Sequence, residues 1–181
     1  MSKGQMDIES NVILTVRDAT FNEVKTVHKR NRVTNRALYG VARLLFGLTN
    51  EMEEFVPRYI AFGTGTVTGS SAPNPTDTGL SNEITDNESN TVRIPITQRN
   101  IINSNLNNGV VKVAFRAYTA SGVFTNITLT EMGLFIEETG NNLFARVGLG
   151  EGVTKGETDV LDVLWEINIR STTTEEVTNE L

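Results

Sequence analysis

The stretch DVLDVLWEINIR, residues 159–170, alternates apolar and polar side chains along its length. Successive side chains of a β-strand point to opposite faces of the sheet, so a strand here has one apolar and one polar face. The apolar face carries Leu161, Val163, Trp165, Ile167 and Ile169, and the polar face carries Asp162, Glu166 and Asn168. This pattern predicts a half-buried strand in a sheet that covers an apolar core.

Shorter alternations recur along the chain, separated by turn residues. Residues 12–16 and 24–29 flank the turn sequence DATFNE and predict a hairpin. Further strands are expected within residues 57–66, 91–98, 110–119 and 126–149, with Pro95 on an edge strand because proline donates no ladder hydrogen bond. Short strands separated by turns are typical of antiparallel sandwiches. We predict a mainly β protein: an antiparallel, jelly-roll-like β-sandwich with one α-helix near residues 35–47.

The predicted helix lies in the sequence TNRALYGVARLLFG. Thr34 or Asn35 is a suitable N-cap, because a short polar side chain can accept a hydrogen bond from the first turn. Gly47 is a suitable end, because glycine readily leaves the helical conformation. The side chains expected on the buried face are Leu38, Val41, Leu45 and Ala42.

A chain of 181 residues is expected to form one domain. We expect an N-terminal arm at residues 1–10, the sandwich domain with its helix at 11–170, and a polar, acidic C-terminal tail at 171–181. The chain has no cysteine, which excludes disulfides and thiolate metal sites. No apolar run is long enough for a membrane span, and no apolar signal core opens the chain. We therefore expect a soluble protein with no membrane partner, made in the cytoplasm.

Positive charge is concentrated in residues 25–47. This stretch holds six of the chain's Lys and Arg residues, and no Asp or Glu occurs from Val24 to Asn50. The net charge of the whole chain is −6, which leaves −12 for the remainder. Such segregation favours contact between copies, or docking onto a differently charged partner. The candidate assembly interface comprises Lys25, His28, Lys29, Arg30, Arg32 and Arg36.

No residue pattern predicts a catalytic, cofactor or metal site. The single histidine, His28, lies among cations, and a strand or interface role is favoured for it. The glycines of GTGTVTGS lack the Lys-Ser/Thr ending of a phosphate-binding loop and predict a turn. Glu131 lies amid apolar residues, which favours a buried ion pair over a catalytic acid. Its expected partner is Arg30 or Arg36.

Several weak motifs occur in a characteristic order. They are the opening hairpin with VTNRAL, then YIAFGTGT, PTDTGLSNEI, ITLTEMGLF, NNLFARV and TKGETDVLDVLWEINI. This order resembles small, β-rich, tail-fibre-like or minor virion structural proteins of tailed bacteriophages, over nearly the whole chain. Residues 62–66 and 76–80 match that family's glycine turn and loop, and residues 131–135 match its buried acidic strand.

The resemblance implies a non-enzymatic virion component, made in the host cytoplasm, that acts by symmetric assembly. Its partners would be copies of itself, in a ring or trimer, and other virion proteins of the tail, neck or capsid. The chain lacks a shaft repeat and a separate receptor-binding head, which argues against a full-length fibre. A collar, neck, baseplate, tail-fibre-attachment or capsid-decorating subunit is a better match.

Two other functions follow from particular residues. The basic residues 25–43, with Lys29, Arg30, Arg32 and Arg36, suggest a nucleic-acid-binding module. Against this, the stretch has little aromatic interleaving, and the acidic remainder would repel a polyanion. A host-glycan-binding sandwich would need exposed aromatic platforms, and Trp165 is expected on the core face.

Overall fold

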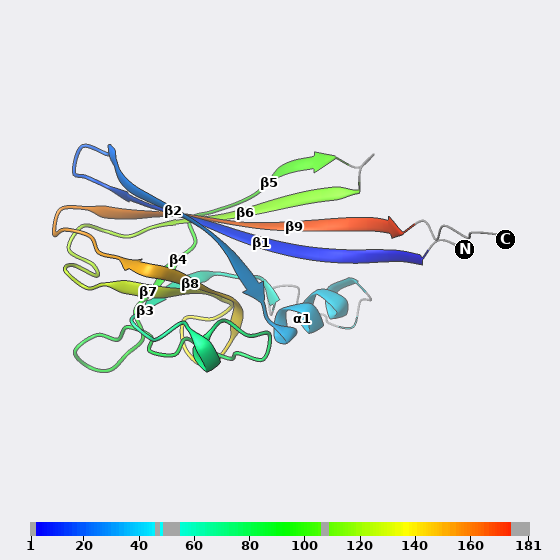
Figure 1. The fold of residues 1–181 in the computed structure, drawn as a ribbon, viewed down its shortest axis with the longest axis horizontal. Coiled ribbons are helices and arrows are strands. Elements are labelled where there is room, and N and C mark those ends of the chain that lie inside the picture. Colours follow the sequence, from blue (N-terminus) through cyan, green and yellow to red (C-terminus); the bar gives the residue numbers. More distant parts are fainter. Residues whose placement is uncertain (1–2, 46–47, 49–54, 106–108, 175–181) are drawn as a thin grey trace.

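The computed structural model describes residues 3–45, 48, 55–105 and 109–174. These residues form one antiparallel sheet with the strand order β4-β3-β7-β8-β2-β1-β9-β6-β5. The strands are β1 (Lys3–Arg17), β2 (Glu23–Val33), β3 (Tyr59–Gly63), β4 (Arg93–Pro95), β5 (Gln98–Asn105), β6 (Val110–Tyr118), β7 (Leu129–Phe135), β8 (Leu143–Val153) and β9 (Val160–Thr174). Within the described residues there is one α-helix, α1 (Asn35–Leu45) (Figure 1). The predicted mainly β, antiparallel class with one helix is confirmed.

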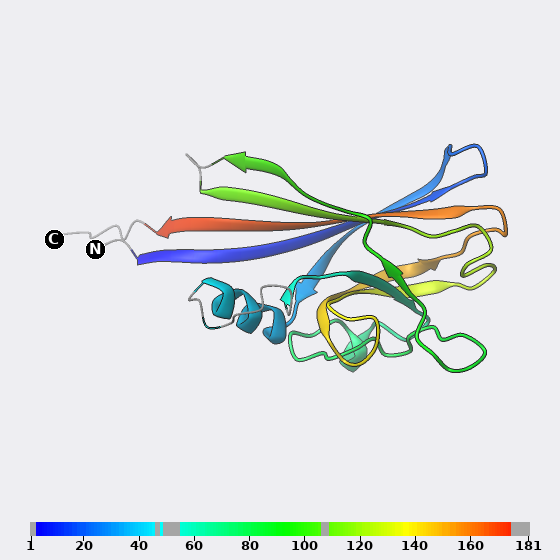
Figure 2. The ribbon, with the colours of Figure 1, turned by 180° about the vertical axis from the view of Figure 1, so that it is seen from behind.

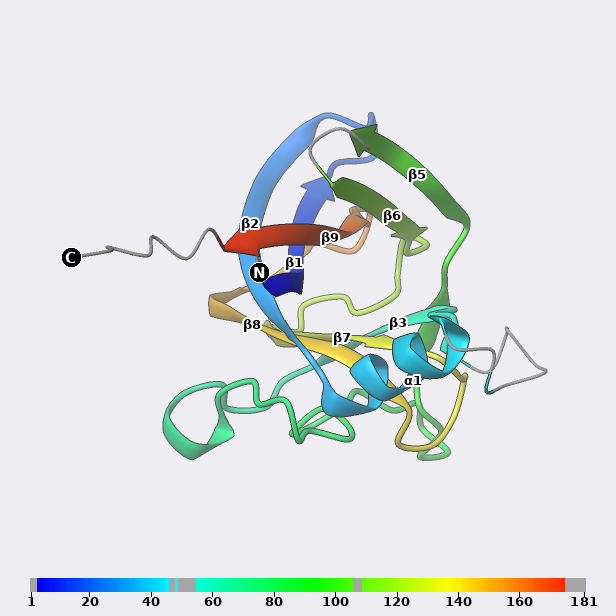
Figure 3. The same cartoon turned by 90° about the vertical axis from the view of Figure 1, so that its right-hand side faces the viewer.

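The sheet curls because its two edge strands are neighbours in the chain. Only two residues separate β4 from β5, yet these strands lie at opposite edges of the sheet. The N–H of Ile96 donates to the carbonyl of Arg58 at 2.7 Å, and the N–H of Thr97 donates to that of Arg116 at 2.8 Å. Figure 2 shows this link running from β5 to β4, and Figure 3 shows the curl along the long axis. The strands thus form one continuous curled sheet, and the predicted sandwich of two sheets is not confirmed.

β1 and β9 form a long ribbon along one side of the molecule. They pair over their whole lengths, from Lys3↔Thr174 to Arg17↔Val160. Residues 3–10, expected to be an arm, are therefore part of β1, and residues 171–174 of the expected tail belong to β9. The remaining tail residues, 175–181, lie outside the described part of the chain.

The core lies between the two halves of the curled sheet. Trp165 of β9 is fully buried, and its indole N–H donates to the Ser10 hydroxyl at 3.0 Å. The burial of apolar side chains such as this one is the main contribution to the stability of a domain without disulfides. One half contributes Val12, Leu14, Val16, Val163 and Trp165, and the other contributes Ile60, Phe62, Met132, Leu134 and Val147. The predicted core face of residues 159–170 is confirmed for Leu161, Val163, Trp165 and Ile167.

Helix α1 begins with the predicted cap but buries a different face. The Thr34 hydroxyl accepts a hydrogen bond from the Ala37 N–H at 3.2 Å and itself donates to the Leu143 carbonyl at 2.9 Å. Ala37 and Gly40 are buried, whereas Leu38 is 44% exposed. The Phe55 ring packs so closely on Gly40 that a Cβ there would collide with it. The predicted burial of Leu38 and Ala42 is therefore wrong, because the glycine face receives the aromatic ring.

The long loop between β3 and β4 packs against the outer face of the sheet. Thr64 donates its N–H to the Asn82 carbonyl at 3.0 Å, and Leu80 packs against Phe135 and Leu143. These contacts with the chain's own sheet hold the loop in place. β7 and β8 are consequently covered on both faces.

Replacing Gly65 with alanine is expected to lower the free energy of unfolding by about 1–3 kcal/mol, through overpacking. An added Cβ would collide with the Glu131 carboxylate and lie 2.6 Å from the Ser81 Cβ and 2.9 Å from the Asn82 backbone nitrogen. Urea unfolding followed by circular dichroism measures the change. Gly79→Ala is the matched control, since its Cβ would meet only the Asn141 Oδ1 at 3.5 Å and should change little. Equal effects of the two substitutions would contradict the packing described for Gly65.

Candidate functional site

The predicted basic interface residues are divided between two faces of β2. Lys25 and Lys29 pair in register with the buried residues Val16 and Val12 of β1, so they lie on the inner side of the sheet. The Lys25 ammonium donates to the Gly152 carbonyl of β8 at 3.2 Å. Strand alternation places the remaining cations of β2, His28, Arg30 and Arg32, on the outer side.

All of these cations except Lys29 are exposed, and Lys29 is half-buried. Arg36 is exposed on α1. Lys29, Arg30 and Arg32 line one groove, described below, and Arg36 is not among the residues that line it.

Strand β2 changes its pairing partner near its C-terminal end, from β1 to β8. Its last pair with β1 is Ser10↔Asn31, and the next residues pair as Arg32↔Arg146 and Val33↔Ala145. Among the described strands, β1 from Lys3 to Glu9 therefore pairs with β9 alone. A fork opens between β1 and β2, and one backbone edge of β1 faces into it.

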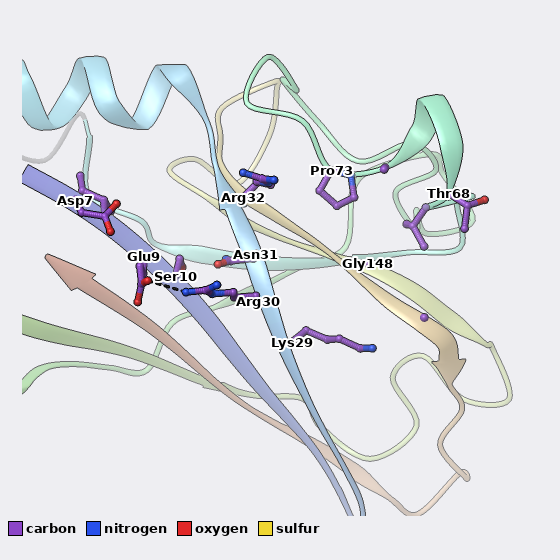
Figure 4. Close-up of a pocket in the computed structure, with 14 residues that line it drawn as sticks. Asp7, Glu9, Ser10, Lys29, Arg30, Asn31, Arg32, Thr68, Pro73 and Gly148 are labelled. Carbon is purple, nitrogen blue, oxygen red and sulfur yellow. Dashed lines mark hydrogen bonds and ion pairs between the residues drawn. The ribbon is translucent and has the colours of Figure 1, made fainter. Parts of the chain in front are cut away.

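The fork forms the wall of a groove of about 700 Å³, which we call the fork groove. Figure 4 shows side chains from β1, β2 and the loop after β3 converging on it. Its lining residues are Asp7, Ile8, Glu9, Ser10, Lys29, Arg30, Asn31, Arg32, Val67, Thr68, Ala72, Pro73, Gly148 and Gly150. The groove is thus bounded by a strand edge, a basic strand segment and a loop.

Charge in the fork groove is only partly neutralised. The Arg30 guanidinium lies 2.6 Å from one Glu9 carboxylate oxygen, and that of Arg170 lies 3.3 Å from the other. Within the part of the chain that the structure describes, no carboxylate oxygen lies within 4 Å of the charged nitrogens of Lys29 or Arg32. These two cations can therefore attract an acidic partner segment without giving up a described ion pair.

A buried ion cluster fixes the loop that forms one wall of the groove. Glu131 of β7 is fully buried, and the Arg146 guanidinium of β8 donates to its carboxylate at 2.7 and 2.9 Å. Arg146 also donates to Asp77 at 2.9 Å and to the Ser81 hydroxyl at 2.5 Å, both in the loop. The Glu131 carboxylate also accepts hydrogen bonds from the backbone N–H groups of Ser81 at 3.2 Å and Asn82 at 2.9 Å.

The predicted partner of Glu131 is wrong. Arg30 or Arg36 was the expected partner, but Arg30 forms an ion pair with Glu9, and Arg146 forms the ion pair with Glu131. The reason is strand order, since β7 and β8 are neighbours and place Glu131 and Arg146 on the same outer face. Burial lowers the pKa of Arg146, but the hydrogen bonds to Asp77 and Glu131 outweigh this and leave its pKa above the usual value.

A second ion cluster, not predicted from the sequence, lies on the outer face near the β1–β2 hairpin. Asp162 accepts from the Arg116 guanidinium at 2.7 and 3.0 Å and from that of Arg17 at 3.1 Å. Burial raises the pKa of Asp162, but the hydrogen bonds and charges of the two arginines outweigh it and hold the pKa below its usual value. The sequence placed Asp162 on the polar face of residues 159–170, but it did not indicate the partners Arg17 and Arg116, which lie on other strands.

Asp162→Asn is expected to lower the free energy of unfolding at pH 7 by about 1–3 kcal/mol, because it removes charge-assisted hydrogen bonds. A lowered folded-state pKa contributes stability above the usual pKa of 3.8, and that contribution is lost as the pH falls through the folded-state value. The difference between wild type and variant should therefore be full at pH 7 and 5 and smaller at pH 3. Urea titrations at the three pH values measure it. A difference that widened at pH 3 would show that the carboxylate does not act as described.

The described residues contain no group of three or more Asp, Glu or His side chains placed to hold a metal ion. The Asp86 carboxylate accepts hydrogen bonds from the N–H groups of Glu88 and Asn90 within its own turn, at 2.9 and 2.8 Å. Trp165 is buried in the core and offers no exposed platform for a sugar. No described helix has the length and apolar character that crossing a membrane requires.

The chain matches no protein-family model, and neither a curated protein nor a solved structure is significantly similar to it. The resemblance to minor virion proteins therefore rests on the quoted motifs alone and stays a prediction.

Proposed function

We propose that this protein is a non-enzymatic structural subunit of a tailed-bacteriophage virion, and that it acts by protein–protein docking in a symmetric assembly. The observation that carries the proposal is the fork groove, which is lined by a strand edge and by cations from both faces of β2. An extended segment of another chain can add to such an edge, with backbone hydrogen bonds giving affinity and neighbouring side chains giving specificity.

The shape of the fork supports this use. Among the strands that the structure describes, β1 has a partner on one side only from Lys3 to Glu9, and proteins usually cover or blunt an edge of this length. The groove volume of about 700 Å³ lies within the range of roughly 300–1,000 Å³ that is typical of binding clefts. The ion cluster of Arg146, Glu131 and Asp77 holds the loop wall in place, so the groove needs little rearrangement to accept a segment.

The charge distribution supports a protein partner over a nucleic acid. The cations of β2 are divided between two faces, and Asp7 and Glu9 lie in the same groove as Lys29, Arg30 and Arg32. A polyanion would meet these carboxylates at close range, whereas a protein segment can place its charges selectively.

Within the virion, the proposed role is that of a collar, neck, baseplate, tail-fibre-attachment or capsid-decorating subunit. We also propose that the fold is related to a jelly-roll-like sandwich, because the two halves of the curled sheet contribute side chains to one core.

The proposal is tested on gradient-purified particles of the phage that encodes the chain. Quantitative mass spectrometry should find the chain at a fixed copy number per particle, and washing in moderate salt should not remove it. Its absence from purified particles, with the chain present in the infected-cell lysate, would contradict the proposal.

A further inference from the structure

The basic stretch of the fork groove is matched by an acidic stretch elsewhere in the same chain. Residues 175–181 have the sequence EEVTNEL, which contains three glutamates and no cation. The groove presents Lys29 and Arg32, for which no carboxylate of the described residues lies within 4 Å. Opposite charges on two segments of one chain suit contact within the chain or between copies.

The position of the last described residue shows where this acidic segment starts. β9 ends at Thr174, which pairs with Lys3 at the outer tip of the β1–β9 ribbon (Figure 1). The ribbon extends beyond β2, since β2 and β1 pair no further than Ser10↔Asn31. Residues 175–181 therefore begin at a tip that projects from the body of the sheet.

Geometry disfavours binding of this segment in the groove of its own copy. The groove begins at Asp7, four residues along β1 from Lys3, which is roughly 13 Å at about 3.3 Å per residue. β1 itself separates β9 from the groove, so the segment would also have to cross two strand spacings, or about 10 Å. These two displacements are perpendicular, so the straight-line distance is roughly 16 Å, or about five of the seven residues at about 3.3 Å each. Only about two residues are then left, fewer than the three needed to pair along Asp7–Glu9.

We propose that residues 175–181 of one copy bind as an added strand in the fork groove of a second copy. Their glutamates then lie beside Lys29 and Arg32, and their backbone pairs with the β1 edge over Asp7–Glu9. This inference rests on the proposed function and names the partner of the groove. The contact joins different surfaces of the two copies, so its repetition produces a closed ring or an open filament.

The test is a charge exchange in the full-length chain, read by sedimentation velocity. The groove variant carries Lys29→Glu and Arg32→Glu, and the tail variant carries Glu175→Lys, Glu176→Lys and Glu180→Lys. Each variant alone should self-associate at least about tenfold more weakly than the wild type, because like charges then meet in the contact. An equimolar mixture should assemble again, since each tail finds a groove of opposite charge on the other variant.

Exposed Arg99 on β5 provides the matched control, and Arg99→Glu should leave assembly unchanged. Two results would overturn the inference: a wild-type chain that is monomeric at all concentrations, or a mixture of the two variants that stays monomeric. Circular dichroism of each variant excludes misfolding as the cause. If the inference fails while the chain is present in purified particles, the proposed function stands and another virion protein occupies the groove.

Discussion

Arg146→Ala is expected to lower the free energy of unfolding by about 3–5 kcal/mol, because it leaves a buried carboxylate without its countercharge. Glu131 is fully buried, and Arg146 supplies two of its hydrogen bonds. The substitution also removes the guanidinium that ties Asp77 and Ser81 to the sheet. Urea unfolding monitored by the fluorescence of the single tryptophan measures the loss.

Two further variants separate charge from simple truncation. Arg30→Ala removes an exposed pair with Glu9 and should cost no more than about 1 kcal/mol. Adding Glu131→Gln to Arg146→Ala should recover part of the loss, because the double variant buries no unpaired charge at that position. A loss below about 1 kcal/mol for Arg146→Ala would show that the cluster does not hold the loop.

Trp165→Ala is expected to lower the free energy of unfolding by about 3–5 kcal/mol, the range for removing a large aromatic side chain from a packed core. Trp165 is fully buried between the halves of the sheet, and its indole N–H bonds to Ser10. The variant lacks tryptophan, so circular dichroism in urea replaces fluorescence as the measurement.

Trp165→Phe is the matched control for this position. It keeps most of the aromatic volume and loses the hydrogen bond to Ser10, so a smaller loss of about 1–2 kcal/mol is expected. Similar losses for the two variants would indicate that the hydrogen bond, and not packing, accounts for the contribution of Trp165.

Local patterns predicted most of the elements correctly. The alternation in residues 159–170, the hairpin around DATFNE, the Thr34 cap and the edge position of Pro95 all depend on neighbours in sequence, and the structure confirms them. The predicted burial of Leu38 was wrong, because Phe55, which lies outside the helix, packs on the opposite face at Gly40 and so determines which face of α1 is buried.

The form of the sheet depends on contacts that the sequence does not display. β4 and β5 are joined by two residues, but nothing local shows that they lie at opposite edges of one sheet. The same applies to β2, which pairs with β1 and then with β8. The fork groove exists because of that change of partner, so only the basic character of one of its walls could be predicted.

The partner of Glu131 carried a signal that was missed. Arg146 stands between Ala145 and Val147 in an apolar strand, and Glu131 stands in the largely apolar strand before it. Two opposite charges in adjacent hairpin strands are natural partners, since a buried charge needs one nearby. The concentrated positive charge of residues 25–47 favoured Arg30 or Arg36 as the predicted partner instead.

The proposed function depends most on the fork groove being a docking site for a protein segment. Amide hydrogen exchange of the subunit, compared between the dilute chain and its assembled form, tests this directly. Assembly should slow exchange in β1 at Asp7–Glu9 and in β2 at residues 29–32, and leave the hairpin turn at residues 18–22 unchanged. Protection confined to the hairpin turn or to β5, with the groove residues exchanging as in the dilute chain, would contradict it.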